Sequence, residues 1–73
     1  MSATKYDNGN TSALQIVGNE GTKLTILQSP SFGKELMFTI TDSGTATSVV
    51  VNDIETLRKI RDFLNESIRW MEA

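Results

Sequence analysis

The apolar residues of this chain change their spacing once, at Asn52 and Asp53. Before that point they alternate with polar residues, the pattern of half-buried β-strands. After it they recur every three or four residues, the pattern of an amphipathic α-helix. A chain whose strands all precede a single helix is expected to form an α+β fold, with the helix packed across one face of an antiparallel sheet.

Four strands are predicted, each bounded by turn-forming residues: 13–17, 22–28, 35–41 and 45–51. Gly18, Pro30 and Gly44 stand in the connections, where glycine favours turns and proline stops a strand. The short connections favour a β-meander, so the predicted order is ββββα. One phase of the alternation supplies the expected core of the sheet: Leu14, Ile16, Leu24, Ile26, Leu36, Phe38, Ile40, Val49 and Val51.

The N-terminal segment 1–11 is polar and carries the turn sequence Asp-Asn-Gly-Asn at 7–10. We predict a flexible tail over 1–11, in which Tyr6 is the one side chain able to anchor the segment. Residues 12–73 then form a single α+β domain.

The predicted helix runs from 53 to about 72. Asn52 and Glu55 have the spacing of a capping box, and acidic residues in the first turn suit the helix dipole. At about 100° per residue, one set of apolar residues covers roughly 120° of the circumference, the width of an ordinary core-facing side. We call this set the apolar stripe: Ile54, Leu57, Ile60, Leu64, Ile68 and Met71.

Two aromatic residues of the helix, Phe63 and Trp70, lie outside the apolar stripe. They are seven residues apart and share a side of the helix, more than 100° from the stripe's centre. Either the sheet curls round the helix and takes both rings into one wide core, or this aromatic ridge contacts a second subunit or another protein. The interface is the preferred interpretation, because Trp and Phe are favoured interface anchors and so small a domain needs extra support.

The opposite phase of the strands also carries one large apolar residue per strand: Val17, Leu27, Met37 and Val50. If the register aligns them, they form a shallow apolar band on the far side of the sheet. Scattered surface hydrophobic residues are the ordinary explanation. The alternative is a sheet-to-sheet dimer or a groove for a ligand strand.

The composition excludes several kinds of chemistry. The chain has no cysteine and no histidine, so disulfides, thiolate or imidazole metal sites, and nucleophilic triads are all ruled out. The acidic residues fall in turns or on the polar side of the helix, where solvation is their ordinary role. We therefore expect a non-enzymatic protein without a cofactor or metal. With no signal peptide and no membrane span, the expected location is the cytoplasm.

Seven basic and nine acidic residues leave a net charge of −2, which disfavours binding to nucleic acid. The basic residues of the helix alternate with acidic ones at spacings of three and four, as in a solvated, ion-paired surface. The alternative is a local nucleic-acid patch. Arg61 lies nearer the apolar stripe, where its stem can cover the core edge or reach across an interface.

The ββββα order is similar to that of PC4-like coactivators and PUR repeats, small folds that bind single-stranded DNA. The resemblance covers most of the chain as element order, and it carries no specific motif. In those families the sheets bind nucleic acid and helices help to form dimers. Here the strands offer only Lys23 and Lys34 as cations, and Phe38 is assigned to the core. Single-stranded nucleic-acid binding is therefore the second hypothesis.

The leading hypothesis is a protein-interaction module, a homodimer that occupies a surface on a larger protein as small phage or bacterial regulators and inhibitors do. Its basis is the small size, the acidic balance, the lack of catalytic side chains and the surplus aromatic residues of the helix. A self-assembling structural subunit is the third hypothesis. The residues expected at a protein interface are Phe63, Trp70, Arg61, Val17, Leu27, Met37 and Val50.

Overall fold

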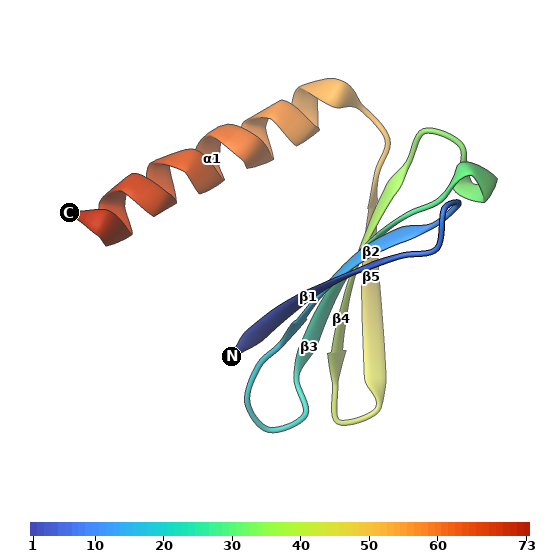
Figure 1. The fold of residues 1–73 in the computed structure, drawn as a ribbon, viewed down its shortest axis with the longest axis horizontal. Coiled ribbons are helices and arrows are strands. Elements are labelled where there is room, and N and C mark those ends of the chain that lie inside the picture. The colour runs from blue at the N-terminus through green and yellow to red at the C-terminus, as the bar shows by residue number, and fades with distance from the viewer.

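The computed structural model describes residues 1–73, except for the side chain of Phe32. Five strands form one antiparallel meander in the order β1-β2-β3-β4-β5, and a single helix, α1, follows (Figure 1). The elements are β1 (Ser2–Asp7), β2 (Ser12–Val17), β3 (Lys23–Gln28), the 3₁₀ turn η1 (Pro30–Phe32), β4 (Leu36–Asp42), β5 (Thr45–Val51) and α1 (Ile54–Glu72). The predicted α+β class and meander are confirmed, and each predicted strand begins and ends within one residue of its observed bounds.

The predicted number of strands is wrong by one, because the segment expected to be a tail contains β1. This strand pairs with β2 along its whole length, from Ser2 opposite Val17 to Asp7 opposite Ser12. Residues 8–11 join the two strands, and among them Asn8 Oδ1 accepts a hydrogen bond from the Thr11 amide at 2.8 Å. β1 escaped prediction because its side chains are mostly polar and exposed, so it lacks the apolar alternation of a half-buried strand.

The register places the predicted core residues on one face of the sheet. Ile26 stands opposite Leu14 on one side and Phe38 on the other, and side chains of directly opposed residues point to the same face. We call this the inner face, which consists of Leu14, Ile16, Leu24, Ile26, Leu36, Phe38, Ile40, Val49 and Val51.

The turn between β4 and β5 holds the last strand in this register. Ser43 and Gly44 have φ angles of 51° and 86°, so both central residues are left-handed, as in the type I′ turns that suit the twist of a hairpin. Glycine tolerates this conformation without steric cost.

Helix α1 begins at a strong cap. Asp53 is extended (φ −125°, ψ 140°), and its Oδ2 accepts hydrogen bonds from the amide of Thr56 at 2.9 Å and from its hydroxyl at 2.7 Å. The cap is therefore one residue later than the predicted Asn52, and Thr56 rather than Glu55 occupies the third helical position. These two bonds satisfy one free amide of the first turn and fix the direction in which the helix starts.

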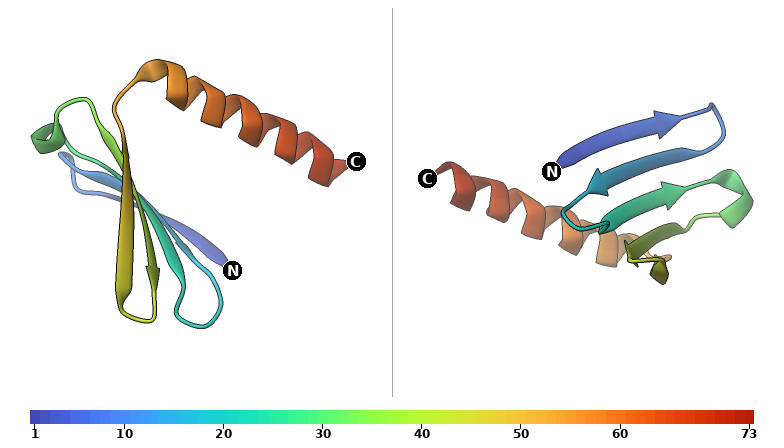
Figure 2. Two further views of the ribbon diagram at one scale, coloured as in Figure 1. Left: turned by 180° about the vertical axis from the view of Figure 1, so that it is seen from behind. Right: turned by 90° about the horizontal axis from the view of Figure 1, so that it is seen from below.

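The prediction that the helix packs across the sheet is wrong for the single chain. α1 leaves the end of β5 and points away from the strands, so that its C-terminus lies far from the sheet (Figures 1 and 2). Within the described part of the chain, extensive contacts join only neighbouring strands, and none involves α1. The connection is short, Asp53 is extended, and the cap fixes the direction in which the helix starts.

As a result, one copy of this chain encloses almost no core. Val51, at 9% exposure, is the only hydrophobic residue that counts as buried among the side chains that the structure describes. The radius of gyration is 13.5 Å, whereas a compact chain of this length is expected to have about 11 Å. The inner face and α1 hold the residues for a core, but the fold leaves them apart.

The cap makes a prediction about pH. The Thr56 hydroxyl, and then its amide, donate to the Asp53 carboxylate and hold its pKa below the ordinary value of 3.8. A lowered pKa stabilises the folded state at neutral pH, and this stabilisation is lost as the pH falls below 3.8 through the lowered pKa. Helix content measured by far-UV circular dichroism should therefore decrease over this acidic range.

Asp53→Asn is the matched control, because asparagine caps a helix but does not titrate. The difference between wild type and Asp53→Asn isolates this carboxylate from the other acidic groups. Asp53→Ala should reduce helix content at neutral pH as well. Unchanged helix content in Asp53→Ala would show that the cap does not hold the helix.

Candidate functional site: the exposed apolar side of the helix and the faces of the sheet

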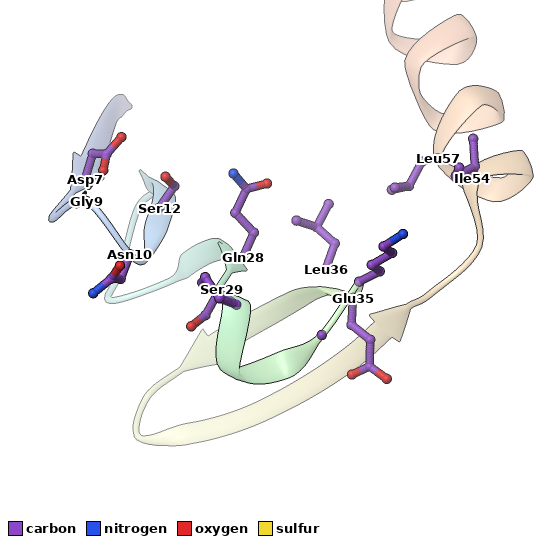
Figure 3. Close-up of a pocket in the computed structure, with 13 residues that line it drawn as sticks. Asp7, Gly9, Asn10, Ser12, Gln28, Ser29, Glu35, Leu36, Ile54 and Leu57 are labelled. Carbon is purple, nitrogen blue, oxygen red and sulfur yellow. Dashed lines mark hydrogen bonds between the residues drawn. The ribbon is translucent and has the colours of Figure 1, made fainter.

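A groove of about 540 Å³ separates the first turns of α1 from the inner face (Figure 3). Ile54 and Leu57 border it on the helix, and Leu36 and Gln28 border it on the sheet. A second hollow of about 300 Å³ lies on the same face and includes Leu14 among its lining residues. The inner face is therefore hollowed and open on the side toward which α1 extends.

The apolar stripe of α1 faces solvent over most of its length. Leu57 and Ile60 are half-buried near the start of the helix. Beyond them, Leu64 and Ile68 are more than half exposed, and Met71 is 77% exposed. An apolar stripe of this width normally faces a core, so its exposure marks a surface that lacks its partner within the chain.

The aromatic ridge is exposed as well. Phe63 is 67% and Trp70 is 78% exposed, so the chain's own sheet does not cover either ring. Large rings of this kind are the residues that contribute most to protein interfaces when they become buried.

The ridge and the stripe form one continuous surface. Only Thr56 and Ser67 lie between them around the helix, and both hydroxyls donate to groups within the same helical segment: Thr56 to Asp53 at 2.7 Å and Ser67 to the Phe63 carbonyl at 3.0 Å. Because neither hydroxyl needs another partner, the whole side behaves as apolar surface. At about 100° per residue it covers roughly 200° of the circumference. We call it the apolar side of α1.

The charged residues of α1 lie opposite this side, with the exceptions of Arg61 and of Glu72, which is five full turns after Ile54. The Nε and Nη2 atoms of Arg61 each lie 3.0 Å from Oδ1 of Asp62, so the guanidinium is drawn from the edge of the stripe toward the charged side. This is the only ion pair in the described part of the chain. The pairs predicted at spacings of three and four, such as Glu55 with Lys59, do not form within 4 Å.

The outer face of the sheet carries an apolar row, in part as predicted. Met37 stands opposite Leu27 and Val50, so the register brings these three residues together. Val17 lies elsewhere, opposite Ser2 and Lys23. Ala13 and Tyr6 complete the row across all five strands. Tyr6 was not assigned to this row because segment 1–11 was predicted to be a tail. The turn sequence at 7–10 was the signal that could have indicated a hairpin there.

Among the residues that the structure describes, no three potential ligands gather in the way that a metal site requires. No helix within the described residues combines the length and the apolar character needed to cross a bilayer.

Comparisons with protein-family models, with curated proteins and with solved structures find no match to this chain. Its function is therefore argued from the surfaces described above.

Proposed function

We propose that this chain is a non-enzymatic protein-interaction module whose contact surface is the apolar side of α1. The observation that carries the proposal is the exposure of this side: it joins the apolar stripe to Phe63 and Trp70 without an intervening charged residue. An exposed, continuous apolar surface on a small domain is typical of a site that binds protein. A more specific form of this proposal is a phage or bacterial regulator that occupies a surface on a larger protein.

Binding of single-stranded nucleic acid receives less support from the surfaces. The two strand lysines lie on opposite faces, Lys5 on the side of the inner face and Lys23 on the outer face. Neither face gathers the cations that phosphate binding requires. We expect no shift with a labelled single-stranded oligonucleotide at low salt, and a salt-dependent shift would reverse this ranking.

A self-assembling subunit is the second candidate, and β5 is the observation that favours it. This edge strand, Thr45–Val51, has no charged residue and no proline, and all of it except Val51 is exposed. Unprotected edges of this kind can pair with the edge of another sheet.

The proposed function can be tested by photo-crosslinking in the native host. A photoreactive residue in place of Ser67, between the ridge and the stripe, should join α1 to another polypeptide on irradiation, and mass spectrometry identifies that polypeptide. The same residue in place of Arg69, about 60° beyond the edge of the stripe and among the charged residues, is the matched control. Adding Phe63→Ser and Trp70→Ser should weaken binding on the order of 100-fold, because each ring is an anchor. Equal yields from both positions would contradict the proposal.

Edge pairing makes a different prediction for light scattering. Assembly through β5 should give masses that grow with concentration, and a charge on the edge from Ala46→Lys should abolish them. Binding through α1 predicts instead that Ala46→Lys leaves the mass unchanged, with Ala46→Ser as the neutral control.

A further inference from the structure

We propose that the polypeptide bound by α1 is a second copy of this chain, and that the two copies clasp each other reciprocally. In this dimer the apolar stripe of each α1 fills the groove over the inner face of the other copy, and the two aromatic ridges meet between the helices. The inference rests on the proposed function and names its partner.

The first argument is the exposed area of the single chain. The chain exposes 5940 Å², whereas a compact monomer of 8.1 kDa is expected to expose about 4,500 Å². The excess of about 1,400 Å² exceeds the roughly 800 Å² per partner of a standard interface, and it falls in the range of obligate homodimers. The extra surface that one chain exposes is therefore as large as the surface that each copy buries in a permanent dimer.

The second argument is that the two surfaces needing cover are complementary and lie on one chain. The inner face is an apolar sheet surface with an open groove, and α1 is an amphipathic helix whose apolar side is exposed. A partner that covers both must offer a helix to the sheet and a sheet to the helix. A second copy offers both, and a two-fold axis makes the two contacts identical.

The third argument is the width of the apolar side. It distinguishes a helix that packs on the sheet of the other copy from a helix that packs on its own sheet. If α1 closed onto its own sheet, that flat surface would cover roughly the 120° of an ordinary stripe. Phe63 and Trp70, on the flank of a surface of roughly 200°, would remain in water. In the clasp each helix contacts a sheet on one flank and the partner's helix on the other, so both rings are covered.

The distribution of charge agrees with this arrangement. The nine residues of the inner face are all apolar, and the apolar side of α1 has two charged residues at its margin, Arg61, paired with Asp62, and Glu72 in the last turn. The remaining charged residues of α1 lie on the opposite side and stay in water when the clasp forms. Asp7, Lys34 and Glu35 border the groove, and Lys5 lies on the same side of the sheet, on the edge strand β1. The nine apolar residues between them carry no charge, which at the centre of the contact would oppose association.

The absence of native cysteine allows a direct test. One copy carries Leu64→Cys on the stripe, and a second, with a different tag, carries Ile40→Cys on the inner face. After the two are mixed and treated with a short bismaleimide, the clasp predicts a covalent species that contains both tags. Arg69→Cys, on the charged side of α1, replaces Leu64→Cys in the matched control and should give little of this species.

Light scattering on the unmodified chain complements the crosslink and needs no variant. The expected mass is twice the chain's 8.1 kDa. A monomeric mass overturns the clasp, and so does a chain with both cysteines that crosslinks only within itself. If Ser67 then still photo-crosslinks to a different protein, the proposed function stands without the clasp. If Ser67 crosslinks to nothing, both fail.

Discussion

One copy of this chain leaves many of its large hydrophobic side chains more than half exposed, and the rest of the account depends on this observation. A chain of 73 residues without cysteine has neither disulfides nor thiolate metal sites to support a small core. Its fold nevertheless separates the two surfaces that could form one, the inner face and the apolar side of α1. Burial of both by association removes from water the surface that the fold leaves exposed.

Two short segments create this separation. The type I′ turn at Ser43 and Gly44 holds β5 in the register that completes the inner face. After the two-residue connection with its extended Asp53, α1 runs away from this face, and the bonds from Thr56 to Asp53 fix its first turn. Local backbone and capping interactions thus set the angle between helix and sheet, and this angle leaves the groove open to a second helix.

Much of the fold could be predicted from the sequence, because its signals are local. Alternation locates β2 to β5, and the three-to-four spacing locates α1 and both of its apolar surfaces. Strand β1 could not be found in this way, since a polar edge strand is held by backbone pairing that leaves no apolar pattern. The packing of α1 was also missed, because it depends on the direction of a two-residue connection rather than on periodicity.

The candidate surfaces show the same limit. Alternation assigned Leu27, Met37 and Val50 to the outer face, but only the register shows that they adjoin one another while Val17 does not. Phe63 and Trp70 could be placed on one side of the helix from spacing alone. That they are exposed depends on where the sheet lies, and spacing carries no information about it.

The concentration dependence of thermal unfolding tests the central claim most directly. If the core forms only between copies, folding is coupled to association, and the unfolding midpoint must rise with protein concentration by mass action. The account predicts this rise for the unmodified chain, with loss of strand and helix signals in one transition. A cooperative transition whose midpoint is independent of concentration would show that one copy builds its own core, and it would contradict the account.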